Sequence, residues 1–176
     1  HNGDLHNFQP HLSGRFTPVG STDSELAFCY LLEQLVLKFG YFEPSLNDIF
    51  SLLEEISPKI AEYGTFNFCL SNGQALFSYA TTKLHWIVRE YPFQYARLVD
   101  IDVDIDFSKF TTEEDRVAVI TTEPLTQNEI WTAYQPGEMI LFRDGKVIKT
   151  ATTTVDRLVR EAKDPSLVRV TKADQY

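Results

Sequence analysis

The amino-acid sequence predicts an α+β fold, in which helices and strands occupy separate stretches of the chain. Two segments with apolar residues at helical spacing come first, at about residues 22–39 and 45–63. From residue 66 onward, short apolar runs alternate with Gly, Pro and Asn, which is typical of strands joined by tight turns. Two helices followed by many strands favour a layered structure in which helices cover a sheet.

The first predicted helix starts at the stretch Thr22-Asp23-Ser24-Glu25. Thr22 is suited to the N-cap, and Glu25, three residues further on, is placed to close a capping box. Asp23 then lies in the first helical turn, and Gly40 is placed to end the helix.

The second predicted helix contains a proline. Pro58 removes a backbone donor, and its ring crowds the preceding helical turn. We therefore expect this helix to kink or break near Ser57 and to end by Gly64. Its apolar stripe consists of Leu46, Ile49, Phe50, Leu53, Ile56 and Ile60.

Turn residues divide the part of the chain that is expected to form strands. Asn72-Gly73 and Asp144-Gly145 are pairs typical of two-residue hairpin turns, so each predicts a hairpin. The predicted strands are residues 66–71, 75–80, 84–89, 116–122, 139–142 and 146–149.

An aspartate-rich run lies within residues 96–107, which we expect to form one extended segment. Its apolar residues alternate with Asp100, Asp102, Asp104 and Asp106. Strict alternation places these carboxylates on one face of a strand, about 7 Å apart from one to the next. A solvated sheet face is expected; a calcium site is the less favoured alternative, because calcium ligands usually come from a curved loop.

Composition indicates a folded domain and limits its partners. The 176 residues are 43% hydrophobic and include thirteen Phe, enough to bury a core. The net charge of −9 argues against nucleic acid or an anionic membrane as a partner, because both require clustered Lys and Arg. No apolar run approaches the roughly 18–20 residues of a membrane span, and no signal peptide is visible, so we expect a cytoplasmic protein.

Cys29 and Cys69 are the two cysteines, one in a predicted helix and one in a predicted strand. Neither has a second Cys or His at ligand spacing, so we expect neither a disulfide nor a metal site. Both are predicted to be buried free thiols that behave as small hydrophobic groups.

We expect one domain over residues 1–149 and a polar tail over residues 150–176. In the tail, Val155, Leu158, Val159 and Ala162 allow a short amphipathic helix before Pro165. The sequence leaves open whether this tail forms that helix or is disordered, and it suggests no role for it.

Two polar stretches within the first 25 residues are the candidate site. Asn2-Gly3 readily forms a turn that can direct an amide side chain and a backbone N–H at one ligand oxygen. Asp23 is expected nearby, at the start of the first helix. Donors beside a fixed carboxylate suit a small amino-acid ligand; a plain surface turn and a simple helix cap are the alternatives.

An ordered set of motifs over about residues 1–148 resembles the class II glutamine amidotransferases, in particular their YafJ-like branch. The set opens with His1-Asn2-Gly3 and Gly20-Ser21-Thr22-Asp23-Ser24-Glu25. It continues in family order with Phe66-Asn67-Phe68-Cys69-Leu70-Ser71-Asn72-Gly73, Thr82-Lys83-Leu84-His85-Trp86-Ile87, the aspartate-rich run at residues 100–106, Thr122-Glu123-Pro124-Leu125-Thr126 and Pro136-Gly137-Glu138.

The resemblance implies the αββα sandwich of the N-terminal-nucleophile hydrolases, with no cofactor and no metal. It implies that Asn2 and Gly3 form the oxyanion hole. It assigns Asp23, with Thr22 beside it, to the α-ammonium group of the substrate. His1 and Asn67 are further candidates for the site.

The nucleophile of the resembled family is a cysteine at the mature N-terminus, and neither Cys29 nor Cys69 matches it. We therefore expect an N-terminally truncated member whose 176 residues are inactive alone. The expected substrate is glutamine or another γ-glutamyl amide, and a separate synthetase or other protein is the expected ammonia acceptor. The alternative from a different class is a non-catalytic αββα module that binds a ligand or partner.

Overall fold

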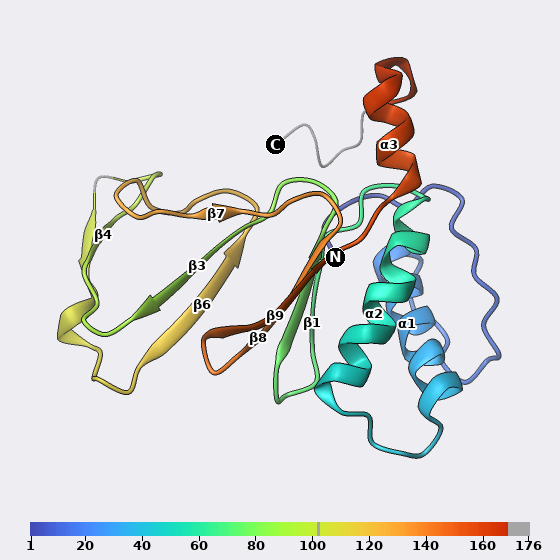
Figure 1. Ribbon diagram of the computed structural model, residues 1–176, viewed down its shortest axis with the longest axis horizontal. Coiled ribbons are helices and arrows are strands. Elements are labelled where there is room, and N and C mark those ends of the chain that lie inside the picture. Colours follow the sequence, from blue (N-terminus) through green and yellow to red (C-terminus); the bar gives the residue numbers. More distant parts are fainter. Residues whose placement is uncertain (102, 169–176) are drawn as a thin grey trace.

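The computed structural model describes residues 1–101 and 103–168, which form helices and sheets in layers. Helices α1 (Asp23–Phe39) and α2 (Leu46–Ala61) lie side by side on one face of a four-stranded antiparallel sheet (Figure 1). A three-stranded sheet packs against the opposite face (Figure 1). The predicted α+β class is confirmed.

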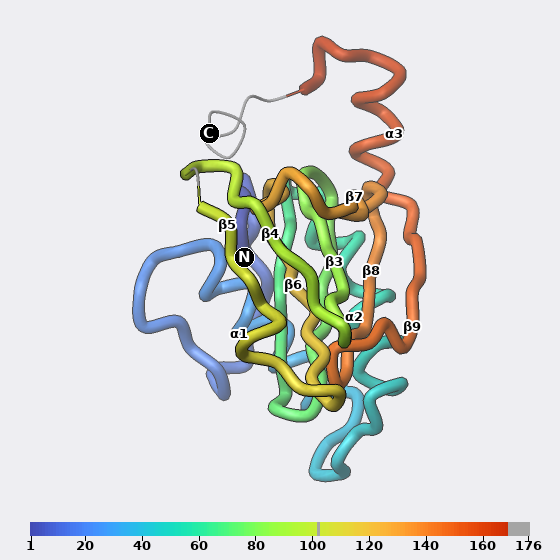
Figure 2. Tube along the Cα trace, turned by 90° about the vertical axis from the view of Figure 1, so that its left-hand side faces the viewer, coloured from blue at the N-terminus to red at the C-terminus, as the bar shows by residue number. Residues whose placement is uncertain are grey.

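The larger sheet has the order β1-β2-β8-β9 and the smaller one the order β6-β3-β7, with a separate β4–β5 hairpin at the far end (Figures 1 and 2). All the predicted strands outside the aspartate run are present, with ends shifted by a few residues. The two-residue strand β7 is an addition, because so short a segment shows no alternation. The bounds are β1 Phe68–Ser71, β2 Leu76–Ala80, β3 His85–Glu90, β4 Tyr95–Arg97, β5 Asp104–Asp106, β6 Arg116–Thr121, β7 Thr132–Ala133, β8 Glu138–Arg143 and β9 Lys146–Thr152.

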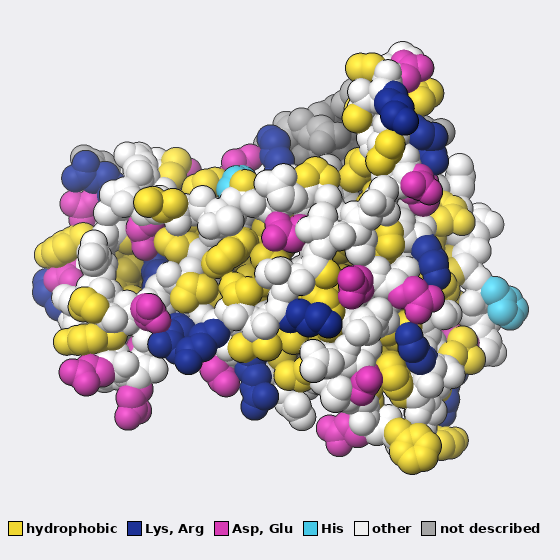
Figure 3. Space-filling model, in the orientation of Figure 1, with side chains coloured by type: hydrophobic (Ala, Val, Ile, Leu, Met, Phe, Trp, Pro, Cys, Tyr) yellow, Lys and Arg dark blue, Asp and Glu magenta, His cyan; other side chains and the backbone are white. Residues whose placement is uncertain are grey.

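Strand β8 joins the two cores because it is buried on both faces. Met139 and Leu141 belong to the core between the helices and the larger sheet. Ile140 and Phe142 belong to the core between the two sheets, where Phe142 meets the Trp86 ring edge-on at 5.8 Å. Fully burying such side chains contributes roughly 1.5–3 kcal/mol each, so this strand is central to stability. On the face drawn in Figure 3, further apolar side chains gather over the smaller sheet.

Helix α2 continues through Pro58 to Ala61, so the expected break near Ser57 is wrong. Pro58 costs the helix one backbone hydrogen bond, but Ser57, Ile60 and Ala61 around it are buried and hold the last turn in place. At the other end, Ser45 and Asp48 form a reciprocal capping box.

The predicted capping box of α1 is only half formed. The Thr22 hydroxyl accepts the Glu25 N–H at 3.3 Å, as expected of an N-cap. The Glu25 carboxylate does not return that bond; it accepts the N–H groups of Val19 and Gly20, each at 2.8 Å. Glu25 therefore fastens the preceding loop to the helix.

The aspartate-rich run is not one extended strand, so this prediction is wrong. Its ends pair with each other as β4 and β5, and Arg97 donates to Asp104 across the hairpin at 3.0 Å. Asp106 caps the short 3₁₀ helix Phe107–Lys109, and Asp102 lies outside the described residues. Alternation misled here because Ile101 and Val103 are 56% and 45% exposed and have no core to face.

Both cysteines are free, but only Cys29 is buried, so the prediction for Cys69 is wrong. Cys69 lies on β1, the edge strand of the larger sheet, and its neighbour Phe68 takes the inward position. Although the residue is exposed, protein atoms around its thiol desolvate it and raise its pKa.

Residues 153–168 leave the larger sheet and form helix α3 (Asp156–Lys163), followed by the 3₁₀ turn Pro165–Leu167. Figure 1 shows α3 projecting beyond the end of α2. Within the described residues, no helix has the length and apolar character needed to cross a membrane.

Candidate functional site

The Asn2-Gly3 turn is built against a distant segment of the chain, residues 63–67. The Asn2 N–H donates to the Asn67 carbonyl at 2.8 Å, and the Asn67 N–H donates back at 3.3 Å. A second bridge joins Leu5 to Gly64. The turn is therefore held like a short strand pair and is not a free surface loop.

Gly3 has a close contact that no other residue can make. Its φ of +149° lies in a region that side chains other than glycine rarely adopt, and a Cβ there would lie 2.0 Å from the Thr65 carbonyl oxygen. Within the described part of the chain, the Gly3 N–H and the exposed Asn2 side-chain amide make no hydrogen bond. Both donors are thus available to a ligand.

The His1 side chain anchors the start of this turn, and it is only 5% exposed. Its Nε2 lies 3.1 Å from the Thr65 carbonyl oxygen, which can only accept, so Nε2 carries a proton. In the neutral ring, Nδ1 then accepts the hydroxyl of Ser24 at 2.8 Å. The ring also packs on Phe66, with centroids 5.1 Å apart. His1 thus connects α1 to residues 65–66.

Asp23 lies beside the turn, as the sequence predicts. Its Oδ2 accepts the Leu5 N–H at 2.7 Å, and its Oδ1 lies 4.0 Å from His1 Nδ1. The side chain is 29% exposed and stands in the first turn of α1, where the helix dipole favours a negative charge. One carboxylate oxygen therefore fixes the backbone after the turn, and the other lies 3.4 Å from the Ser24 hydroxyl oxygen.

Thr22 and Asn67 have defined partners within the protein. Thr22 is exposed and uses its hydroxyl to cap α1. The Asn67 side chain is buried; its oxygen accepts the N–H groups of Thr81 and Thr82 at 2.8 and 3.1 Å, and its Nδ2 donates to the Thr82 hydroxyl at 2.8 Å. Asn67 supports the site through its backbone, because its side chain is occupied elsewhere.

A cavity of about 270 Å³ lies beside these residues, between α1 and the edge strand β1. His1 and Ser24 form its polar end, and apolar side chains line most of the remainder. Cys69 also borders it. Of the candidate residues His1 alone lines this cavity; Asn2, Gly3 and Asp23 are not among its lining residues.

No sequence pattern predicts the supporting roles of Thr65 and Ser24. Thr65 contacts both His1 and Gly3, yet it is more than sixty residues away in the chain. The turn at Gly3 and the turn at Gly64 are each pressed against the backbone of the other segment. This pairing of glycines is visible only once the fold is known.

The arrangement can hold a small ligand with two kinds of group. Backbone N–H and side-chain amide N–H donors stabilise negative charge on a carbonyl oxygen where they reach the same atom. The carboxylate of Asp23, which bonds the backbone just after the turn, attracts an ammonium group. An amino acid with a side-chain carbonyl offers both groups.

Comparison with known proteins identifies relatives over nearly the whole chain. The family model described as "Glutamine amidotransferases class-II" matches residues 1–166. The Escherichia coli K12 protein named "Putative glutamine amidotransferase YafJ" is 44% identical over 142 residues, which cover 81% of this chain and 56% of that protein. A Haemophilus influenzae protein named "Putative glutamine amidotransferase" is 43% identical over 149 residues, covering 84% of this chain and 50% of its own length.

A solved structure supports the same relationship. The crystal structure of a "predicted glutamine amidotransferase" from Pseudomonas aeruginosa superposes with a TM-score of 0.74 and is 43% identical in sequence. The match covers 85% of this chain and 58% of that chain. The present chain thus spans about half the length of the curated relatives.

Proposed function

The chain belongs to the class II glutamine amidotransferase family, and on that premise we propose that it carries the substrate-holding half of a glutamine-hydrolysing site. Asn2 and Gly3 bind the oxyanion, and Asp23 binds the α-ammonium group of glutamine. The observation that carries this proposal is the geometry of Gly3. Its N–H has no partner among the described residues, while its Cα is pressed against Thr65.

The proposed reaction is acyl transfer in two steps. A thiolate attacks the side-chain carbonyl carbon of glutamine, and Asn2 and Gly3 hold the resulting tetrahedral oxyanion. The C–N bond then breaks as the leaving nitrogen takes up the proton that the thiol lost, which the α-amino group of an N-terminal cysteine carries. Ammonia leaves with a thioester in place of the amide. Water then attacks the thioester, passes through a second oxyanion, and releases glutamate with the free thiol. The same two donors serve both steps, because the oxyanion forms at the same oxygen.

We propose that the nucleophile is an N-terminal cysteine outside residues 1–176. Cys29 is buried inside α1, away from any ligand. Cys69 is exposed, but the raised pKa of its thiol disfavours the thiolate that attacks a carbonyl. Neither cysteine of this chain therefore suits the role.

The layered arrangement supports a complete fold of the αββα type. The helices α1 and α2 and the two sheets correspond to three consecutive layers of such a sandwich. In this proposal, the fourth layer lies over the outer face of the smaller sheet.

The test measures glutamate and ammonia released from glutamine by the full-length polypeptide that the gene encodes. Asn2→Ala is expected to lower kcat by roughly 100- to 1000-fold, as for other losses of one oxyanion donor. Gln74→Ala, at an exposed residue of the β1–β2 turn, is the matched control and should leave kcat unchanged. A wild-type protein that releases no glutamate, or an Asn2→Ala variant with normal kcat, would contradict the proposal. If the protein turns over γ-glutamyl peptides faster than glutamine, the proposed substrate becomes a γ-glutamyl peptide in place of glutamine.

A further inference from the structure

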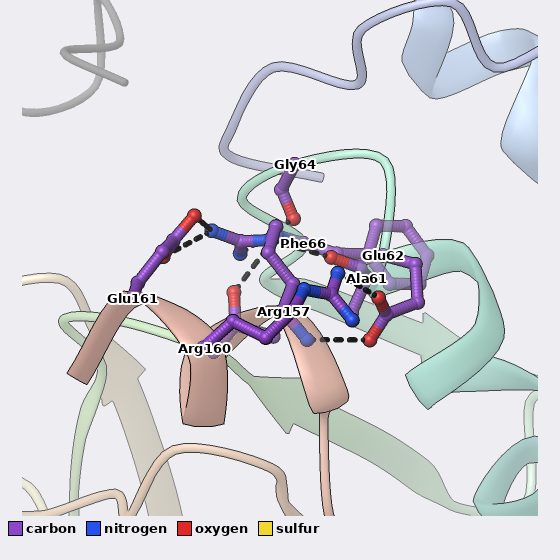
Figure 4. A network of polar contacts seen from close by, with 8 residues as sticks. Ala61, Glu62, Gly64, Phe66, Arg157, Arg160 and Glu161 are labelled. Carbon is purple, nitrogen blue, oxygen red and sulfur yellow. Dashed lines mark hydrogen bonds and ion pairs between the residues drawn. The ribbon is translucent and has the colours of Figure 1, made fainter. Parts of the chain in front are cut away.

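A polar network around Arg157 contacts the segment that supports the Asn2-Gly3 turn (Figure 4). Arg157 lies in the first turn of α3. Its Nε donates to the Ala61 carbonyl at 2.9 Å, and its Nη2 donates to the Gly64 carbonyl at 3.0 Å. One planar guanidinium thus ties the last turn of α2 to the start of residues 64–67, a geometry that a lysine cannot reproduce.

The guanidinium is itself held in place. Its Nη1 donates to both carboxylate oxygens of Glu161 at 2.8 Å, and the side chains of Arg157 and Glu161 are only 18% and 14% exposed. The Arg157 backbone N–H donates to Glu62 at 2.8 Å. Since Val155, the N-cap residue, supplies no side-chain acceptor, Glu62 provides the cap of α3 from the end of α2.

Helix α3 is also anchored by apolar contacts. Val155 is 3% exposed and belongs to the core between the helices and the larger sheet, and Leu158 packs against that core. The helix therefore cannot shift without disturbing both this core and the polar network, which keeps Arg157 in a fixed position relative to α2.

The segment that Arg157 holds is pressed directly against the turn. A Cβ at Gly64 would lie 1.9 Å from the Asp4 carbonyl oxygen, and the His6 N–H donates to the Tyr63 carbonyl at 2.7 Å. Next along the chain, the Thr65 carbonyl contacts Gly3 and His1. Because the contacts of Gly64 with Asp4 and of Thr65 with Gly3 are between backbones, a shift of residues 61–65 is transmitted to the Gly3 N–H and not absorbed by flexible side chains.

We propose that Arg157 is a positioning residue for the Asn2 and Gly3 donors. By joining the Ala61 and Gly64 carbonyls, it fixes the backbone against which Gly3 is set, and α3 thereby becomes part of the construction of the site. This inference rests on the proposed function of Asn2 and Gly3, although the mechanical coupling itself does not.

Arg160 provides a matched control on the same helix. It is 59% exposed and its Nη2 donates to Glu62 at 2.8 Å. Among the described residues, it makes no hydrogen bond to a backbone carbonyl of residues 61–65. Its loss removes a similar charge from α3 without releasing the supporting segment.

The test compares Arg157→Met, Arg157→Lys and Arg160→Met in the full-length polypeptide. For Arg157→Met, kcat for glutamine hydrolysis should fall about 10- to 100-fold, the effect of misplacing catalytic donors by a fraction of an ångström to an ångström. KM should stay within about threefold, because Asp23 is untouched and binding in the ground state is largely kept. The kcat of Arg157→Lys should lie between those of the wild type and Arg157→Met, since one ammonium cannot bridge both carbonyls as the planar guanidinium does. Arg160→Met should match the wild type.

Amide hydrogen exchange supplies a readout that does not depend on activity. Peptides covering residues 1–6 and 61–67 should exchange faster in Arg157→Met than in the wild type, with β8 unchanged, and Arg160→Met should show neither effect. Equal kcat values for the Arg157 and Arg160 variants, or unchanged exchange at residues 1–6, would overturn the inference. If Arg157→Met loses protection from amide exchange throughout the protein, that variant is globally destabilised. The kcat and the exchange of Arg157→Lys then decide whether the inference holds. If the wild-type protein does not hydrolyse glutamine, the proposed function is wrong. Amide exchange at residues 1–6 still tests whether Arg157 is coupled to the Asn2-Gly3 turn.

Discussion

Replacing Gly3 with alanine should inactivate the site, although it adds only one methyl group. The added Cβ would lie 2.0 Å from the Thr65 carbonyl oxygen, whereas ordinary contact begins at 3.4 Å, so the two groups must separate by about 1.4 Å. The φ of +149° adds strain of order 1–3 kcal/mol. A displacement of this size moves the Gly3 N–H out of hydrogen-bonding range of an oxyanion, and we expect kcat for glutamine to fall at least about 100-fold.

Gly73→Ala separates backbone strain from displacement of the donor. Gly73 also has a positive φ, +84°, but a Cβ there would meet no atom within 4 Å. In the full-length polypeptide, Gly73→Ala should lower Tm by a few degrees, at roughly 2–4 °C per kcal/mol, and keep the wild-type kcat. The reasoning is refuted if Gly3→Ala retains kcat within about threefold of wild type, or if both variants lose activity equally.

Two further predictions concern Asp23 and a partly buried ion pair. Asp23→Asn keeps an acceptor for the Leu5 N–H but removes the charge, so KM for glutamine should rise about tenfold with a smaller change in kcat, as steady-state kinetics would measure. Glu129 pairs with Arg89 through two bonds of 2.7 and 2.6 Å. Burial raises the pKa of Glu129, but the hydrogen bonds from Arg89 and Thr126 outweigh it and hold that pKa below 4.5. Since the folded-state pKa lies below the unfolded one, the stability from this ionised carboxylate is complete above about pH 4.5 and is lost as pH falls through the lower value. Urea unfolding should therefore show a constant difference in the free energy of unfolding between wild type and Glu129→Gln from pH 8 to 5. This difference should become smaller below pH 4.5.

A different result would contradict each of the two predictions for Asp23 and Glu129. An unchanged KM in Asp23→Asn would remove Asp23 from substrate binding and leave it as a support for the turn. If the difference in unfolding free energy between wild type and Glu129→Gln grows as the pH falls, the folded-state pKa of Glu129 is raised. That is opposite to the lowering expected from the Arg89 contact.

The parts of this fold that sequence predicted are those specified by local patterns. Period and turn chemistry placed α1, the Asn72-Gly73 hairpin and the Asp144-Gly145 hairpin, because the residues that decide them are neighbours in the chain. The failures arise where distant packing decides. Core contacts carry α2 past Pro58, and the absence of a facing core lets the aspartate run fold into a hairpin.

The site shows the same division. Sequence order placed Asp23 near Asn2-Gly3, but the contact that shapes the turn comes from Thr65, and the residues that hold Thr65 in place lie near the end of α2 and in α3. No local pattern links residues 3, 65 and 157. The sequence also left the helix α3 undecided, because its apolar stripe is short and the groups that anchor Arg157 and Val155 lie mostly far away in the chain.

The start of α1 resolves an ambiguity that the motif alone could not. A carboxylate in a first helical turn can serve the helix or a ligand, and the same residue cannot do both fully. Here the helix is capped by Thr22, and the neighbouring loop is held by Glu25. Asp23 is released from capping: one carboxylate oxygen accepts the Leu5 N–H at 2.7 Å, and the other lies 3.4 Å from the Ser24 hydroxyl and 4.0 Å from His1 Nδ1. Distributing three tasks over Thr22, Asp23 and Glu25 leaves Asp23 as the residue whose charge can act on a ligand.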